Sequence, residues 1–173
     1  MGDGQQIDLC LDKYCLQYML LLANQSQNGF IKDYFDLFVE LTDIKVVFRA
    51  VKTGKSADFM QSALVSTDNL DALSLAKAAA KGEDSLFTFL QTAGYKEFAE
   101  ALKNSPAAFE KMCDDALMAR LKESRLISFG PEKVLAYYYA RLVEIRNLRI
   151  ILTCKESGAS YETVAERMRE IYV

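Results

Sequence analysis

The chain has 173 residues, of which 51% are hydrophobic and 26% charged, so it can bury a core and is not a disordered protein. Its net charge of -3 and its dispersed Lys and Arg residues argue against a nucleic-acid partner. The sequence contains no histidine, which removes the commonest general base and metal ligand and disfavours an enzyme.

Apolar residues recur at three-to-four spacing along almost the whole chain, and no segment sustains the alternation typical of a strand. This pattern predicts an all-α protein. The opening six residues lack the periodicity, and we expect a frayed end without function there. In chain order, the predicted helices cover residues 7–24, 30–52, 56–65, 69–80, 84–93, 95–104, 106–125, 131–156 and 160–171.

Glycine and proline mark the ends of the predicted helices. Gly54 and Gly158 follow two long periodic segments, where a residue with positive φ caps a helix C-terminus. Pro106 and Pro131 stand at the first position of a predicted helix, where the missing N–H group costs nothing.

An internal repeat is the most informative feature of the sequence. Residues 34–56 align without a gap on residues 138–160, 104 positions later, and residues 11–15 resemble residues 109–113. A period near 100 residues is too long for an ordinary helical solenoid and indicates a duplicated domain. We therefore expect two helical units, each a hairpin around a long central helix with short helices beside it: a complete unit over residues 1–104 and an incomplete one over residues 105–173.

Five stretches carry a family resemblance: residues 40–45 with Arg49, residues 129–137, residues 144–152, Gly158, and residues 167–173. Together they closely resemble the C-terminal half of the C subunit of V-type and A-type rotary ATPases, a central-stalk socket family whose vacuolar members are known as the d subunit. The resemblance implies a full chain about twice this length with three helical units, so one unit and part of another are expected to be missing upstream.

The same resemblance implies a function. In that family the helical units form a funnel, whose opening receives the central shaft and whose narrower base sits on the membrane proteolipid ring. The chain is thus expected to be a non-catalytic subunit that couples shaft to ring in ATP-linked proton or sodium transport. A free-standing helical adaptor that binds another protein is the alternative, and a small all-helical enzyme that uses Glu144 is a weaker one.

The candidate site residues belong to the family motifs, and their expected roles are structural or partner contact: Glu40, Asp43, Gly130, Pro131, Glu132, Tyr137, Glu144, Arg146, Asn147, Arg149 and Arg169. Glu144 and nearby cations could bind an anion or a partner, but an acid that recurs as Glu40 favours a helix-bridging role. Glu132 is expected to stabilise a helix N-terminus through the macrodipole. Three consecutive tyrosines, 137–139, span about 200° of a helix, so at least one is expected in the core and another on a contact surface.

No catalytic, cofactor-binding or metal-binding residue is expected. Residues 54–56 lack the upstream glycine of a phosphate loop, and Cys10 and Cys15 lack the spacing and the second cluster of a zinc site. The four cysteines suit reduced thiols, no apolar run could cross a bilayer, and no charged-then-apolar leader opens the chain. We expect a cytoplasmic protein, peripheral to the membrane through the ATPase complex.

The predicted helix over residues 131–156 is expected to lack part of its cover, because the second unit is incomplete. In the whole protein the upstream unit would cover this apolar face. The isolated chain is expected either to self-associate or to fold the short helix that starts at Ser160 onto the face.

Overall fold

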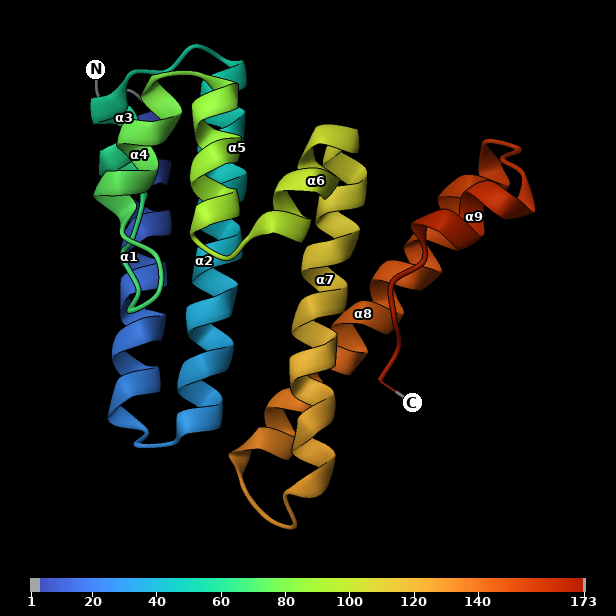
Figure 1. The fold of residues 1–173 in the computed structure, drawn as a ribbon. Coiled ribbons are helices and arrows are strands. Elements are labelled where there is room, and N and C mark those ends of the chain that lie inside the picture. The colour runs from blue at the N-terminus through green and yellow to red at the C-terminus, as the bar shows by residue number, and fades with distance from the viewer. Residues whose placement is uncertain (1–3, 173) are drawn as a thin grey trace. The chain divides into compact units, whose positions relative to one another are not determined.

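The computed structural model describes residues 4–172, which form nine α-helices and one 3₁₀ helix and contain no strand (Figure 1). The all-α prediction is confirmed. The chain divides into two compact units, one ending at Ala99 and the other beginning at Glu100, and helix α6 (Lys96–Asn104) crosses the boundary.

The first unit contains α1 (Gly4–Gln25), α2 (Gly29–Lys52), α3 (Ala57–Ala63), α4 (Ala72–Ala80) and α5 (Glu83–Thr92). Helices α1 and α2 form a hairpin, α3 packs against both, and α4 packs against α2 and α5 (Figure 1). Asn28 caps the start of α2 after the hairpin turn, its side chain accepting the main-chain N–H of Ile31 at 3.1 Å.

Helix α2 is the centre of the first unit. Val39, Ile44 and Val47 are fully buried, since the apolar residues of α2 cover two faces rather than one. One face meets α1 in an apolar cluster that includes Leu16 and Leu20. The helix pair α4 and α5 buries the side chains of Leu75, Ala76, Ala79, Leu86, Phe87 and Leu90.

The second unit contains α7 (Pro106–Lys122), η1 (Glu123–Leu126), α8 (Pro131–Glu156) and α9 (Tyr161–Arg167). Helices α7 and α8 form a hairpin, and the short helix α9 packs against both. Phe109, Met118 and Leu121 of α7 are buried in this hairpin, together with Val143 of α8.

The aligned segments of the two units have the same local structure. Gly54 and Gly158 follow α2 and α8 with φ of 65° and 69°. After each glycine, a main-chain N–H reaches back five residues at 2.9 Å, which makes both ends Schellman caps. The short helices α3 and α9 each have seven residues and are capped by Ser56 and Ser160, 104 positions apart.

Several predicted helix ends differ from the structure by two to four residues, and two of the differences matter here. The last helix was expected to reach residue 171, but α9 ends at Arg167 because Met168 is extended, with φ -61° and ψ 137°. Helix α1 begins at Gly4 rather than at residue 7, so part of the opening expected to fray is helical. Residues 1–3, the rest of that opening, lie outside the described residues.

Candidate functional site

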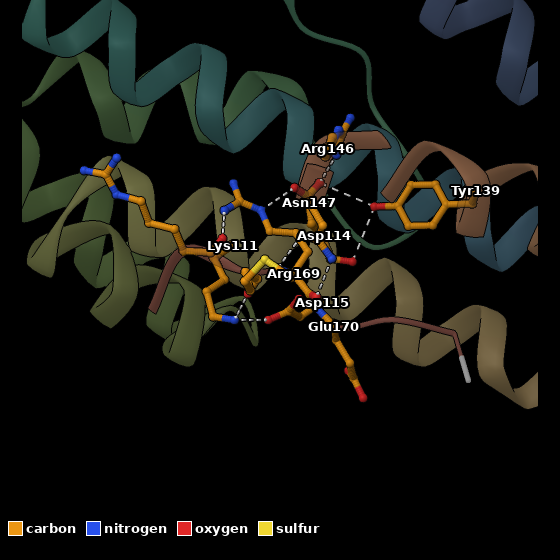
Figure 2. Close-up of polar contacts among 10 residues, drawn as sticks. Lys111, Asp114, Asp115, Tyr139, Arg146, Asn147, Arg169 and Glu170 are labelled. Carbon is orange, nitrogen blue, oxygen red and sulfur yellow. Dashed lines mark hydrogen bonds and ion pairs between the residues drawn. The ribbon is translucent and has the colours of Figure 1, made fainter. Parts of the chain in front are cut away.

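A polar cluster joins α7, α8 and the chain that follows α9 (Figure 2). The carboxylate of Asp114 accepts a hydrogen bond from Nε of Arg169 at 3.0 Å and another from Arg146. The hydroxyl of Tyr139 donates to the main-chain carbonyl of Asp114 at 3.3 Å. Because both guanidinium groups bind the Asp114 carboxylate, these two hydrogen bonds are assisted by charge. We call Asp114, Tyr139, Arg146, Asn147 and Arg169 the C-terminal clasp.

The clasp fixes the main chain directly after α9. Asn147 accepts the N–H of Arg169 at 2.9 Å and donates its side-chain amide to the carbonyl of the same residue at 3.0 Å. The N–H of Glu170 donates to Asp115 at 2.7 Å. These contacts give residues 168–172 a defined path although they form no helix.

Further polar contacts hold the end of the described chain. Lys122 pairs with Glu170, Ser124 and the Tyr172 hydroxyl lie 3.1 Å apart, and the Arg125 guanidinium lies 4.7 Å from the centre of the Tyr172 ring. Residues 168–172 are therefore attached chiefly through charged and polar groups.

The single carboxylate of Asp114 lies between the two guanidinium groups of the clasp. Asp114 and Arg169 have side chains only 15% and 14% exposed, so their pairing is screened weakly by water. Burial alone would lower the pKa of Arg146, but the carboxylate of Asp114 raises it above its ordinary value.

The equivalent place in the first unit is apolar. In the aligned hairpins, Leu16 occupies the position of Asp114, and Val65 occupies the position of Arg169. Both belong to one apolar cluster, against which Phe35, the equivalent of Tyr139, is packed. The same junction is thus held by apolar packing in one unit and by an ionic cluster in the other.

Asp43 takes the place of Asn147 in the first unit. Its Oδ2 accepts the N–H of Val65 at 2.9 Å, but its Oδ1 is buried with no hydrogen-bond partner among the described residues. The side chain is 1% exposed, and this burial raises its pKa to about 7. Main-chain donation by Val65 and the charge of Lys13 lower that pKa, whereas the charge of Glu40 raises it.

The sequence model of the ATP synthase (C/AC39) subunit family matches residues 1–167. The chain belongs to this family. The C subunit of the V-type sodium ATPase of Enterococcus hirae is 29% identical over 173 residues, which is 97% of this chain and 52% of that protein. The chain thus spans about half the length of the curated relative that it matches. No solved structure matches the chain.

The family resemblance expected from the motifs is therefore confirmed. None of the helices in residues 4–172 is long and apolar enough to span a membrane. The same residues hold no cluster of three or more side chains that could bind a metal ion.

Two of the family-motif residues tie segments of the first unit together, and three others belong to the clasp. Glu40 accepts hydrogen bonds from Thr67 at 2.7 Å and from Asn69 at 3.1 Å, so it ties α2 to the segment before α4. Asp43 ties α2 to the segment after α3 in the same way. The others are Arg146, Asn147 and Arg169 of the clasp.

Three family-motif residues gather at the start of α8. Gly130 precedes the helix without a side-chain cap, and Pro131 takes the first helical position. Glu132 is buried and folds back over Gly130, where a Cβ atom would meet its Oε2 at 1.9 Å. A side chain at position 130 would therefore displace Glu132.

The remaining motif residues Tyr137, Glu144 and Arg149 are exposed on α8. Glu144 pairs with Arg141 on its own helix, whereas Glu40 ties α2 to the segment before α4. The two acids therefore differ in their contacts although they are aligned in sequence. Among the tyrosines, 139 is buried whereas 137 and 138 are exposed.

The sequence analysis missed Asp114, Asp115, Lys111 and Tyr139, although all contact the segment after α9 or its clasp. One feature of the sequence could have identified Asp114. Because Asp114 aligns with the apolar Leu16, it places an acid on the inner face of a hairpin helix, where an acid needs a cationic partner.

An apolar stripe lies exposed along α8. Its members follow alternating steps of three and four residues, interrupted by Arg141, and are 52% to 70% exposed: Val134, Tyr138, Ile145, Leu148 and Leu152. We call these five residues the α8 stripe. Helix α9 contacts α8 but leaves the stripe exposed, so of the two expected outcomes for this face, cover by the helix from Ser160 is not observed.

Proposed function

We propose that the chain is a non-catalytic component of a V-type ATPase that couples the rotating central shaft to the membrane proteolipid ring. The carrying observation is that the family sequence model covers residues 1–167. A relative named as the C subunit of a V-type sodium ATPase adds to it. The transported ion would be H⁺ or Na⁺, and the chain would lie on the cytoplasmic side, attached to the membrane through the complex.

The construction of the units suits a coupling role. Transmission of torque needs stiff bodies, and hairpins of long helices with closely packed interiors resist deformation. It also needs contact surfaces, for which the α8 stripe is one candidate.

The buried acids suit a structural role better than a catalytic one. Glu40 and Asp43 contact neighbouring segments of the fold through hydrogen bonds. Burial and contact with Glu40 raise the pKa of the Tyr95 hydroxyl, which therefore stays neutral.

Reconstitution of the rotary ATPase with and without this chain tests the proposal. With the chain present, ATP hydrolysis is expected to drive ion transport into vesicles, and a tagged chain is expected to co-purify with the shaft and ring proteins. Without it, hydrolysis by the catalytic head should persist while transport is lost. Equal transport in both preparations would contradict the coupling role.

A further inference from the structure

Three buried acids on one face of α2 hold the connection between α3 and α4, residues 64–71, which we call the α3–α4 segment. Asp36, Glu40 and Asp43 are 5%, 3% and 1% exposed, and they follow one another at steps of four and three residues. An acid is seldom buried this deeply without a polar partner. The segment that lies against this face therefore has to supply partners.

Two of the three acids act purely as acceptors. The ammonium group of Lys32 lies 2.7 Å from the carboxylate of Asp36 and 2.6 Å from that of Asp68 in the segment. Glu40 accepts a hydrogen bond from the hydroxyl of Thr67 at 2.7 Å. Neither contact needs a proton on the acid of α2.

Asp43 has a partner for only one of its two oxygens. Its Oδ2 accepts the N–H of Val65 at 2.9 Å, and its Oδ1 is buried with no partner among the described residues. The aligned side chain of Asn147 accepts the N–H of Arg169 at 2.9 Å and also donates to the carbonyl of that residue at 3.0 Å. Since Arg169 aligns with Val65, a proton on Oδ1 would let Asp43 donate to the carbonyl of Val65 in the same way.

We propose that the α3–α4 segment is a proton-operated latch, which is closed on α2 while Asp43 carries a proton on Oδ1 and opens when that proton passes to water. An ionised Asp43 loses its donor and leaves a charge in an apolar interior, and opening of the segment hydrates that charge. Opening also uncovers Leu64, Val65 and Leu70, which are 2%, 8% and 1% exposed in the closed segment. The inference does not depend on the coupling of shaft to ring.

The charged groups near Asp43 set the pH at which the latch opens. Burial raises the pKa of Asp43 to about 7, whereas the N–H of Val65 and the charge of Lys13 on α1 lower that pKa and the charge of Glu40 raises it. Among the other titratable groups at this face, Asp36 and Asp68 share Lys32, and the hydroxyl of Tyr95 binds Glu40.

The sign of the pH dependence follows from the two states of Asp43. In the open segment the carboxyl group is hydrated and its pKa returns to the ordinary value of 3.8. Between about pH 4 and about pH 7 the closed segment therefore binds more protons than the open one. The open population is expected to rise by up to about tenfold per pH unit across this window and to stay constant above it.

Hydrogen exchange in the full-length protein measures the opening. The exchange rate of the Val65 N–H, divided by its intrinsic rate at each pH, should follow the expected rise and then level off near pH 7. Above that pH, Val65 should exchange faster than Ile44, which is fully buried on α2. A corrected rate that does not change with pH, or one equal to that of Ile44 above about pH 7, would overturn the latch.

The second unit contains an internal control. The N–H of Arg169 is held by the amide of Asn147, which does not titrate, so its corrected exchange rate should stay constant between about pH 5 and about pH 7. A rise at Arg169 equal to that at Val65 would show that the whole chain opens together, and it would overturn a latch confined to the α3–α4 segment.

Variants test whether Asp43 operates the latch. Asp43→Asn should keep the exchange of Val65 slow and independent of pH, because an amide supplies both the acceptor and the donor. Lys13→Met should move the pH at which the rate levels off upwards, and Glu40→Gln should move it downwards while it retains an oxygen for the Thr67 hydroxyl. Lys155→Met, an exposed change in the second unit, should not move it.

The two charge variants keep the test decisive if Asp43→Asn does not fold. Opposite shifts for Lys13→Met and Glu40→Gln support the latch, because they identify Asp43 as the titrating group. Shifts in the same direction, no shift in either variant, or a pH dependence that survives in a folded Asp43→Asn protein would overturn it.

Discussion

Asp43 and Asn147 hold equivalent main-chain segments with different chemistry. Asn147 offers an acceptor to the N–H of Arg169 and a donor to its carbonyl. Asp43 offers Oδ2 to the N–H of Val65, while its Oδ1 is buried without a partner among the described residues. A proton on Oδ1 would give Asp43 the same donor that Asn147 has. The raised pKa of Asp43, about 7, fits a carboxyl group that folds in its neutral form.

Stability is therefore predicted to fall as the pH rises from about 4 to about 7. In this window the unfolded Asp43 has lost its proton whereas the folded one retains it, so the native state binds more protons. Asp43→Asn should remove this dependence and stabilise the protein at pH 8 by up to about 4 kcal/mol. Urea unfolding between pH 4 and 8 measures both effects.

The reciprocal change supplies the control. Asn147→Asp should introduce a weaker pH dependence in the second unit, because the buried carboxyl would lie in the clasp with Arg146 and Arg169, whose charges favour its ionised form. Lys13 on α1 and Glu40 on α2 face Asp43 and oppose each other in their effect on its pKa. A stability difference between wild type and Asp43→Asn that stays constant with pH would contradict the assignment.

Gly54 and Gly158 should respond equally to substitution. Both have φ near +65°, and an added Cβ would meet no atom within 4 Å at either position. The cost of Gly54→Ala or Gly158→Ala is therefore the backbone strain alone, about 1 kcal/mol each. Gly29→Ala is the control, since Gly29 lies in a helix without positive φ. Thermal melts in which only one cap variant is destabilised would argue against equivalent caps.

At the scale of elements, the sequence predicted the long helices well and the segments between helices poorly. Helix α8 runs from Pro131 to Glu156 as expected, because proline and a glycine cap define its ends locally. The chain after Arg167 could not be placed in the same way. Its path depends on Asp114 and Asn147, which lie far away in sequence and contact it only in the folded unit.

The burial of two aligned acids, Glu40 and Glu144, could not be predicted from the sequence either. Glu40 and Glu144 align, but one is buried under Thr67 and Asn69 and the other is exposed. The difference comes from the segment that follows each short helix, and periodicity within a helix contains no information about that segment.

Because the clasp contains ion pairs, the attachment of residues 168–172 to α7 and α8 is predicted to weaken as the salt concentration rises. Asp114→Leu alone should destabilise the second unit by about 1 to 3 kcal/mol, because it leaves the largely buried Arg169 without its carboxylate. Adding Arg169→Val reproduces the Leu16 and Val65 pair of the first unit and should recover part of the loss. Hydrogen exchange of residues 168–172 and urea unfolding at low and high NaCl provide the measurements.

A double-mutant cycle measures the interaction between Asp114 and Arg169 apart from the effect of each substitution alone. The coupling between positions 114 and 169 is expected to exceed about 0.5 kcal/mol and to shrink at high salt. Additive effects of the two changes, independent of salt, would show that Asp114 and Arg169 do not act as a pair.

At the scale of the molecule, each unit has a helical hairpin, a short helix that follows it, and a glycine cap at the end of its central helix. They differ in the layer over the central helix, since α4 and α5 cover α2 whereas no equivalent pair covers α8 among the described residues. This difference is the reason to propose a complete repeat over residues 1–104 and an incomplete one over residues 105–173. It is also the basis for expecting the isolated chain to self-associate when no partner is present.

The isolated chain is predicted to bind no nucleotide and to hydrolyse no ATP. The sequence has no phosphate loop. Several of its cations are already engaged: Lys13 donates to a main-chain carbonyl of α3 at 3.1 Å, and Arg146 and Arg169 meet Asp114. Binding to the folded state raises stability, so a site with a Kd of about 10 µM would add about 2.7 kcal/mol at about 1 mM Mg-ATP. We expect no shift in the urea midpoint at that concentration, and a saturable shift would contradict a non-catalytic role.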